Sequence, residues 1–379
     1  MRTSTIYDAV MRPHFLAIAL VVSVGMAVSD RMTCQAQVAP ARVLAIVPSP
    51  KGGPPITAKN LPPALALAMK AQVDAFQLFN TWAELEPGVG SYQLQALKSP
   101  LDYLGGQLGW HLMLTIGLIN TLIRQVPPDL ATTAWDDPTL IQRFHRLLDA
   151  IIPLFNSHLE YLAVGNEVDI YFQRHPDELG AYQTFYNDAV AYLHSNAPGV
   201  RIGVTTTFGG ASGTSMSAVQ ALNLMSDVFI LTYYPLGTDF IVSRPQAPLT
   251  DFPRMIQLFG GRPVILQEVG YPSSTLLKSS AKTQAQFVDS VFTAWTQAGA
   301  SIPFLSYDTM HDFGDKFCDE LKAGIYSGVP DPDGHFEAYL CSLGLRYVGG
   351  SPKAGWSQFV KGANALRASE EGSATPGAD

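Results

Sequence analysis

The stretch Leu159-Glu160-Tyr161-Leu162-Ala163-Val164-Gly165-Asn166-Glu167 shows the pattern from which the fold is predicted. A mostly apolar run of strand length leads into a glycine and two polar residues, which is typical of a buried parallel strand and its end. A helical pattern from about Glu178 to Ser195 follows. A strand followed by a helix is the repeating unit of parallel α/β folds.

Eight such strands, seven of them followed by a helix, are predicted between Arg42 and Leu366. The predicted strands cover residues 42–47, 73–80, 111–117, 159–164, 200–205, 228–235, 263–268 and 302–307. The predicted helices cover residues 60–72, 137–155, 178–195, 217–225, 249–259, 282–298 and 356–366. Eight units favour a closed (β/α)8 TIM barrel over an open sheet, and no nucleotide-binding glycine motif favours the open sheet. We therefore predict one α/β barrel domain over residues 40–367.

The composition of the 379-residue chain supports a large core and limits its partners. Hydrophobic residues make up 47% of the chain, charged residues 15%, and the net charge is −8. An acidic chain without a basic stretch argues against a nucleic-acid partner. The eight histidines show no grouping typical of a metal site, and we expect neither a metal nor an organic cofactor. We expect a monomer.

The two ends of the chain lie outside the predicted barrel. The apolar run at residues 14–28, preceded by Arg2 and Arg12, is typical of a secretory signal and short for a spanning helix. We predict a leader over residues 1–36 and a secreted or periplasmic protein that leaves the membrane after cleavage. An uncleaved membrane anchor is the alternative. The small, polar residues 368–379 predict a disordered tail.

Cys318 and Cys341 are the cysteines of the predicted barrel domain, whereas Cys34 falls in the leader. Because an exported domain meets an oxidising environment, we predict a disulfide between Cys318 and Cys341. The bond would fasten the main irregular insertion, from about residue 311 to 347. Two unpaired buried thiols are the alternative.

Two acids end predicted strands at positions where barrel enzymes carry reacting side chains. Glu167 ends the fourth strand and Glu268 the seventh, 101 residues or three strand-helix units later. Carboxylates placed after strongly apolar strands destabilise the fold unless they have partners or a function. A pair of carboxyls across a barrel mouth is the arrangement used in glycoside hydrolysis, and a separation of ~5–5.5 Å gives retention of configuration. A helix-capping or ion-paired glutamate is the structural alternative for each.

Five segments match a known family in order and in strand position. They are residues 82–92 (Trp82-x-Glu84-x-Glu86-Pro87 with Tyr92), 162–167, 232–235 (Thr-Tyr-Tyr-Pro), 264–273 (with Glu-Val-Gly-Tyr-Pro-Ser) and 343–354. Together they resemble clan A retaining β-glycoside hydrolases, which are TIM barrels, and are closest in motif to endo-β-1,3-glucanases and endo-β-1,4-galactanases. The resemblance covers about residues 42–366.

The resemblance implies a role for each matching residue. Glu167 is expected to be the acid/base, Glu268 the nucleophile, and Asn166 a ligand of the sugar 2-hydroxyl. Tyr234 is expected to orient Glu268. Strand alternation agrees, because it places Ile230, Thr232 and Tyr234 on one face and so favours Tyr234 over Tyr233 as the inward residue.

The other residues that are candidates for sugar contact also have possible structural roles. Many clan members have a tryptophan floor after the eighth strand; here Tyr307 is expected to substitute for it. Trp82 is either a sugar platform or a core residue, and Asn120 either a sugar contact or a turn residue. Four further acidic positions and one histidine also have open roles. Glu84 and Glu86 are solvated or loop-bracing, and His311 and Asp312 line the cleft or form a local pair. Asp169 tunes Glu167 or caps the next segment.

The resulting hypothesis is a glycosidase that hydrolyses a β-linked glycan by double displacement. The resemblance favours an endo-acting enzyme on a β-glucan or β-galactan polysaccharide. A non-catalytic polysaccharide-binding barrel and a transglycosylase with the same intermediate are the alternatives. A metal-dependent barrel hydrolase is disfavoured by the scattered histidines.

Overall fold

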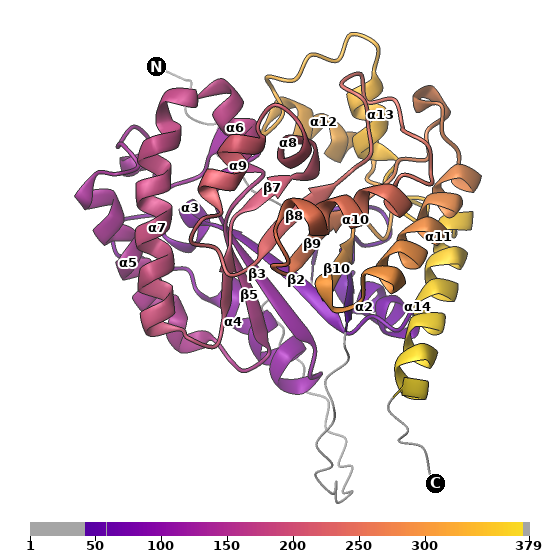
Figure 1. The fold of residues 1–379 in the computed structure, drawn as a ribbon, viewed down its shortest axis with the longest axis horizontal. Coiled ribbons are helices and arrows are strands. Elements are labelled where there is room, and N and C mark those ends of the chain that lie inside the picture. Colours follow the sequence, from indigo (N-terminus) through magenta and orange to yellow (C-terminus); the bar gives the residue numbers. More distant parts are fainter. Residues whose placement is uncertain (1–41, 58, 374–379) are drawn as a thin grey trace, which may run out of the picture.

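A ring of parallel strands forms the centre of the computed structural model, which describes residues 42–57 and 59–373 (Figure 1). The strands are β1 (Val43–Ile46), β2 (Ala75–Thr81), β3 (His111–Asn120), β5 (Leu159–Asn166), β6 (Arg201–Gly203), β7 (Thr205–Thr207), β8 (Phe229–Tyr233), β9 (Val264–Val269) and β10 (Phe304–Tyr307). A short β4 (Ile123–Arg124) pairs antiparallel with the end of β3.

The ring closes through the fifth barrel strand, which is divided at Val204 into β6 and β7. β6 pairs with β5, and β7 pairs with β8. Between those pairs the order is β5-β3-β2-β1-β10-β9-β8, with parallel pairing throughout. Eight strand positions thus form the ring, and the predicted (β/α)8 barrel is confirmed.

Alternate residues of the strands fill two separate cores. In β1, Val43 and Ala45 face the inside of the ring with Met113, Ile230 and other side chains. Leu44 and Ile46 point the other way, into the larger core beneath the helices. This division follows from the two-residue period of a strand, and it explains why the strands read as continuous apolar runs.

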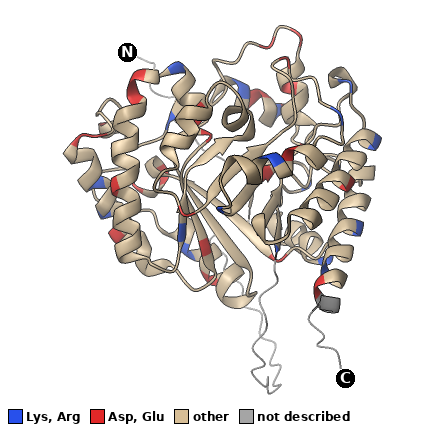
Figure 2. Cartoon of the chain, in the orientation of Figure 1, with Lys and Arg blue, Asp and Glu red and all other residues tan. Residues whose placement is uncertain are grey.

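Helices surround the ring, and all seven predicted ones are present. They are α2 (Leu61–Lys70), α5 (Pro138–Ile151), α7 (Leu179–Asn196), α9 (Met216–Leu222), α10 (Pro248–Leu258), α11 (Ala281–Ala298) and α14 (Ala354–Ser373). In Figure 1, α5 and α7 lie on one side and α11 and α14 on the other. Charged residues lie mainly on these helices and on loops (Figure 2). Short helices that were not predicted follow several strand ends: α3 (Trp82–Leu85), α4 (Gln95–Pro100), α6 (Val168–Arg174) and α8 (Phe208–Ser212).

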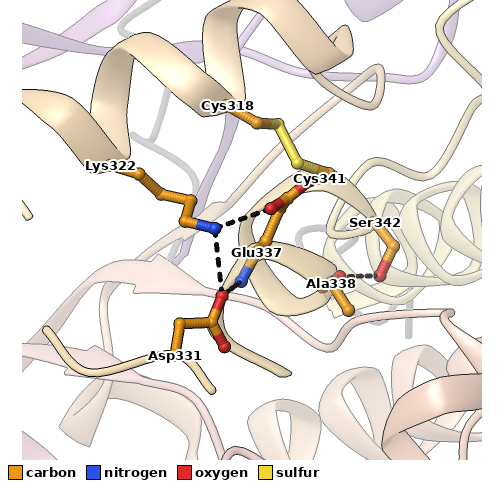
Figure 3. The surroundings of a disulfide bond; sticks show 7 residues. All are labelled: Cys318, Lys322, Asp331, Glu337, Ala338, Cys341 and Ser342. Carbon is orange, nitrogen blue, oxygen red and sulfur yellow. Dashed lines mark hydrogen bonds and ion pairs between the residues drawn. A yellow bond between two sulfur atoms is a disulfide. The ribbon is translucent and has the colours of Figure 1, made fainter. Parts of the chain in front are cut away.

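The insertion at residues 311–347 is more regular than predicted. It contains α12 (Asp315–Ala323) and α13 (His335–Cys341), which lie together at the upper edge of Figure 1. The predicted disulfide joins Cys318 to Cys341, with their Cα atoms 6.1 Å apart (Figure 3). Lys322 adds ion pairs to Asp331 and Glu337 at 3.2 and 2.6 Å. The insertion is therefore fastened by its own covalent and ionic contacts.

The predicted terminal segments are only partly covered by the structure. Helix α14 continues to Ser373, so residues 368–373 are helical and the predicted start of a disordered tail is wrong. Contacts of the last turns explain this, since Arg367 pairs with Asp74 and Arg42 pairs with Glu370. The leader and residues 374–379 lie outside the described residues. In the described part, no helix is both long and apolar enough to cross a membrane.

Candidate active site

Glu167 and Glu268 border one cavity of about 240 Å³ at the C-terminal ends of the barrel strands. The strand ends provide the first group of lining residues: Val47, Ser49, Gln77, Phe79, Asn120, Gln125, Asn166, Glu167, Tyr234, Glu268 and Asp308. The second group comes from the insertion: Phe313, Phe317, Glu320, Leu321, Gly324, Ile325, Tyr326, Tyr339, Leu340 and Leu343. Pro54 and Ile56 complete the lining. The structure therefore brings the two predicted catalytic glutamates to one site.

Glu167 enters the cavity through an unusual backbone conformation. Its φ of 47° and ψ of 42° lie in the left-handed region, which costs about 1–2 kcal/mol for a residue with a Cβ. The turn lets both Asn166 and Glu167 reach the cavity, although neighbouring strand residues normally face opposite sides. Glu167 accepts hydrogen bonds from Thr232 Oγ1 at 2.7 Å and Thr121 Oγ1 at 2.8 Å. Burial raises the pKa of Glu167, and these two hydrogen bonds oppose the shift.

Glu268 reaches the cavity through a β-bulge. Leu266 pairs with Leu231 but Glu268 pairs with the next residue, Thr232, so β9 carries an extra residue at this point. The bulge re-aims one side chain, and both Gln267 and Glu268 therefore point inward. Burial, and then the charges of Glu167 and Asp308, raise the pKa of Glu268 to about 8. Hydrogen bonds from Tyr234 at 2.8 Å and Gln267 at 3.3 Å oppose that shift.

Tyr234 joins Glu268 to a third carboxyl, Asp308. The tyrosine hydroxyl lies 2.8 Å from Glu268 Oε2 and 2.8 Å from Asp308 Oδ2. A phenol has one proton to donate, so both contacts are satisfied only if one carboxyl is protonated and donates to the tyrosine oxygen. Burial raises the pKa of Asp308 to about 6, against the hydrogen bond from Tyr234. The two distances are equal, so the geometry requires one protonated carboxyl and does not select between Glu268 and Asp308.

Gln267 links the residues around the two glutamates. Its Oε1 accepts hydrogen bonds from Thr205 at 2.7 Å and Thr115 at 3.0 Å. Its amide nitrogen donates to Asn166 Oδ1 at 2.7 Å. Asn166 in turn donates to Asn120 Oδ1 at 3.2 Å. This chain fixes the amide of Asn166, which is the predicted sugar ligand, before any substrate arrives.

The hydrogen-bond donors differ between the two glutamates. Three buried carboxyls near one another repel, so the cluster retains protons at neutral pH. The threonine hydroxyls at Glu167 can donate to a carboxylate or accept from a carboxylic acid. The amide nitrogen of Gln267 only donates, and therefore favours the ionised form of Glu268. Glu167 as acid and Glu268 as nucleophile is the assignment that satisfies these groups.

The structure places two predicted sugar contacts outside the cavity. Trp82 is 0% exposed, packs on Phe144 of α5 and donates to Glu86 Oε2 at 2.9 Å, so the core alternative is correct. Tyr307 is 1% exposed and faces Phe359 of α14, because Phe304 and Ser306 take the inward positions of β10. The expectation that Tyr307 forms a sugar floor is therefore wrong, and Asp308 lines the cavity instead.

The remaining open positions have structural roles. Glu86 is fully buried and pairs with Arg143, so it braces the loop and is not solvated. Glu84 completes a capping box with Thr81 at the start of α3. Asp169 accepts two hydrogen bonds from Thr207 and so fastens α6 to the end of β7; the charge of Glu167 contributes to raising its pKa to about 7, after burial.

His311 and Asp312 do not form the expected local pair. His311 hydrogen-bonds Ser49 and Arg346, whereas Asp312 forms an ion pair with Lys353 at 2.6 Å. Neither belongs to the cavity lining. Among the described residues, no group of three or more His, Cys, Asp or Glu side chains is arranged to hold a metal ion.

Sequence reasoning missed several residues of the site. Asp308 follows the eighth strand directly, and the strand-end rule that selected the two glutamates also applies to it. Gln77 and Gln125 give no such signal, since glutamine is common on surfaces. Tyr326 and Tyr339 come from the insertion, whose position over the barrel is not encoded in any short motif. Tyr339 packs edge-on against Tyr234, with ring centroids 5.4 Å apart.

Comparisons with known proteins find similarity in structure but not in sequence. No family model matches the chain, and no curated protein matches its sequence. A GH5_18 protein from Streptomyces cattleya in complex with GlcNAc superposes with a TM-score of 0.67 at 15% identity, over 89% of this chain and 82% of that one.

Two further structures give similar values. An exo-β-1,4-mannosidase from Opitutaceae bacterium strain TAV5 gives a TM-score of 0.61 at 18% identity over 81% of this chain, and the match spans about half (55%) of the mannosidase. A family 39 glycoside hydrolase from Bacteroides cellulosilyticus WH2 gives 0.58 at 16% identity, over 86% of this chain and 64% of that one. These similarities show that the chain has the (β/α)8 barrel fold found in these glycoside hydrolases.

Proposed function

We propose that the chain is a retaining β-glycoside hydrolase with Glu268 as nucleophile and Glu167 as acid/base. The observation that carries this proposal is a pair of buried glutamates that enter one cavity from β5 and β9 with different sets of hydrogen-bond donors. Neighbours in fold whose names describe glycosidases support the same reaction class.

The reaction proceeds in two displacements at the anomeric carbon. In the first, the Glu268 carboxylate forms a bond to that carbon while protonated Glu167 gives its proton to the leaving oxygen. In the second, the Glu167 carboxylate removes a proton from water, whose oxygen displaces Glu268 and releases the sugar. Tyr234 stabilises the Glu268 carboxylate, and Asn166 is placed to bind the 2-hydroxyl.

The lining of the cavity favours a neutral sugar. It includes four acids, Glu167, Glu268, Asp308 and Glu320, and no Lys, Arg or His belongs to the described lining. A uronic acid would bring another negative charge to this site with no cation to pair it, which is unfavourable in a buried setting. Asn120 and Asn166 offer amide groups that suit hydroxyls.

The identity of the sugar is the finer part of the proposal. The Tyr-Pro motif at residues 234–235 favours a β-glucan or β-galactan and endo action. The exo-β-1,4-mannosidase, and a GH5_18 variant from Bifidobacterium longum in complex with Manβ1-4GlcNAc, favour testing β-mannosides as well. We therefore propose a panel of neutral β-glucosides, β-galactosides and β-mannosides, each as an aryl glycoside, a disaccharide and a polysaccharide.

A trapping experiment tests the mechanism. Glu268→Gly with azide is expected to yield the glycosyl azide of inverted configuration, because azide fills the space of the nucleophile. Azide rescue that instead appears in Glu167→Gly with inversion would reverse the two roles. Binding of a polysaccharide without turnover by the wild-type chain would support the non-catalytic barrel, and products extended by an added sugar acceptor would support a transglycosylase.

We also propose that the protein is exported. The apolar run at residues 14–28 and the Cys318–Cys341 disulfide agree with an oxidising compartment. Fractionation of expressing cells, with N-terminal sequencing of the mature protein, tests export, the cleavage site and the anchor alternative. Size-exclusion chromatography of the same sample tests the expected monomer.

A further inference from the structure

The cavity has two walls of opposite chemical character. The strand ends present amides, carboxyls and hydroxyls, as described above. The wall formed mainly by the insertion is largely aliphatic and aromatic: Ile56, Phe313, Phe317, Leu321, Ile325, Leu340 and Leu343. Its polar side chains are Glu320, Tyr326 and Tyr339. A substrate that fills this cavity therefore meets hydrogen-bonding groups at one end and hydrocarbon at the other.

Helix α12 supplies the centre of the apolar wall. Phe317 and Leu321 are four residues apart and so lie on the same face of the helix, and both line the cavity. Both side chains remain partly exposed, and Phe313 packs edge-on against Phe317 at 5.0 Å. The disulfide from Cys318 holds α12 in place, so this apolar face cannot easily withdraw into a core.

The polar wall contains two hydrogen-bond acceptors that no described group satisfies. Gln77 Oε1 and Gln125 Oε1 are buried without a partner, and both residues line the cavity. A buried acceptor left unpaired destabilises the empty site, because it has lost its water and gained no donor. Sugar hydroxyls are donors that fit such a site, so these amides mark the end of the cavity that receives the sugar.

We propose that the substrates are short β-glycosides with an apolar aglycone, an alkyl or aryl group that lies against Phe317 and Leu321. This inference rests on the proposed glycosidase function. A polysaccharide would place a sugar at both walls, and most hydroxyls of the second sugar would lose water against Leu321, Ile325 and Leu343, which offer no hydrogen bond. An apolar group at the same place increases the binding constant about fourfold for each methylene removed from water.

Matched glycosides of one sugar test this proposal. Methyl, hexyl and phenyl β-glycosides are compared with the β-1,4-linked disaccharide, for glucose, galactose and mannose, by kcat/KM. We expect the hexyl and phenyl compounds of the accepted sugar to exceed the methyl compound by at least about tenfold in 1/KM, and to exceed the disaccharide in kcat/KM. Binding of the same compounds to Glu268→Gln is measured by calorimetry, which does not depend on turnover.

A single substitution separates the apolar wall from general effects. Leu321→Ser is expected to reduce the ratio of the hexyl to the methyl glycoside in kcat/KM about fivefold to tenfold. The matched control is Leu224→Ser, at a leucine that is 68% exposed and does not belong to the cavity lining, where the preference should not change.

The possible outcomes distinguish the two proposals. A chain that cleaves disaccharides or polysaccharides better than hexyl and phenyl glycosides is a glycosidase without the proposed apolar site. A chain that binds hexyl glycosides through Leu321 but cleaves nothing has the site and lacks the proposed activity. Absence of both binding and cleavage overturns both proposals.

Discussion

The barrel wall and the insertion wall of the cavity differ in how they are held and in what they offer. On the barrel wall, Glu167, Asn166 and Glu268 extend from strand ends and are linked through Gln267 and threonine hydroxyls. On the insertion wall, apolar side chains project from α12 and the segments around it, which a disulfide and ion pairs hold together. The first wall is fixed by the sheet and the second by local cross-links.

This difference indicates a division of labour within one cavity. Reacting groups need positions fixed to fractions of an ångström, and strand ends of a closed barrel provide that rigidity. Substrate choice can be altered by a connection without disturbing the ring. Changes to the barrel wall should therefore lower kcat, whereas changes to the insertion should act mainly on KM and stability.

The largest effect is expected at the nucleophile. Glu268→Gln should lower kcat by more than about a thousandfold, because the amide cannot form the glycosyl-enzyme bond. Steady-state kinetics on an aryl glycoside measure this. Glu160→Gln, at the opposite end of strand β5 from Glu167, is the control and should stay within about threefold of wild type. Normal turnover by Glu268→Gln would place catalysis elsewhere.

The effect at the acid/base should depend on the leaving group. Glu167→Gln cannot donate a proton, so we expect about 10²–10⁴-fold loss with an alkyl glycoside. The loss should be much smaller with a dinitrophenyl glycoside, whose leaving group needs no proton. Rates on both substrates are compared for the variant and wild type. Equal losses on the two substrates would contradict the assignment of Glu167.

Removal of the disulfide should act on the insertion wall. The double variant Cys318→Ser/Cys341→Ser frees a loop of 23 residues and is expected to lower the free energy of unfolding by ~3 kcal/mol. KM should rise more than kcat falls if the insertion mainly binds substrate. Thermal melts and kinetics measure both. Glu337→Gln, which removes one partly exposed ion pair to Lys322, is the control and should change stability by under about 1 kcal/mol. A fall in kcat alone would place the insertion in the catalytic step.

The smallest effect concerns stability and pH at Asp308. Burial raises the pKa of Asp308 to about 6 in the folded chain, above the unfolded value of ~3.9. The protonated carboxyl therefore favours the folded state fully below about pH 3.9, and this stabilisation is lost as the pH rises through about 6. Asp308→Asn avoids the buried charge, so its free energy of unfolding at pH 8 should be ~1–2 kcal/mol higher than that of wild type. The difference should vanish near pH 4. Urea denaturation at the two pH values measures it, and a gain of equal size at both would show that protonation of Asp308 is not the cause.

Sequence patterns predicted most of the barrel wall because they depend on short-range rules. Strand alternation selected Tyr234 over Tyr233, and the structure shows Tyr234 bonded to Glu268 while Tyr233 points outward to Asp251. The strand-end rule selected both glutamates. The disulfide between the two cysteines was predicted from the oxidising environment of an exported protein. Each prediction thus used either residues within one strand or the expected location of the protein.

The same rules did not decide the direction of two aromatic side chains at strand ends: they left Trp82 open and were wrong for Tyr307. Trp82 and Tyr307 follow or end barrel strands and so met the strand-end rule, yet both pack beneath helices. The side chain of the last strand residue points inward or outward according to the direction of the residue before it. For Tyr307, the inward place of Ser306 decided the matter.

The sequence by itself determined the repeated strand-helix unit, the eight barrel positions, and the two glutamates as the acids that end buried strands. It did so because hydrophobic period and chain order are local properties. Only the tertiary structure decided that consecutive residues, Asn166 with Glu167 and Gln267 with Glu268, both face the cavity. A left-handed residue in one case and a β-bulge in the other break the alternation, and pairing with neighbouring strands maintains both. The apolar insertion wall was likewise decided by packing across the barrel mouth, between segments far apart in the chain.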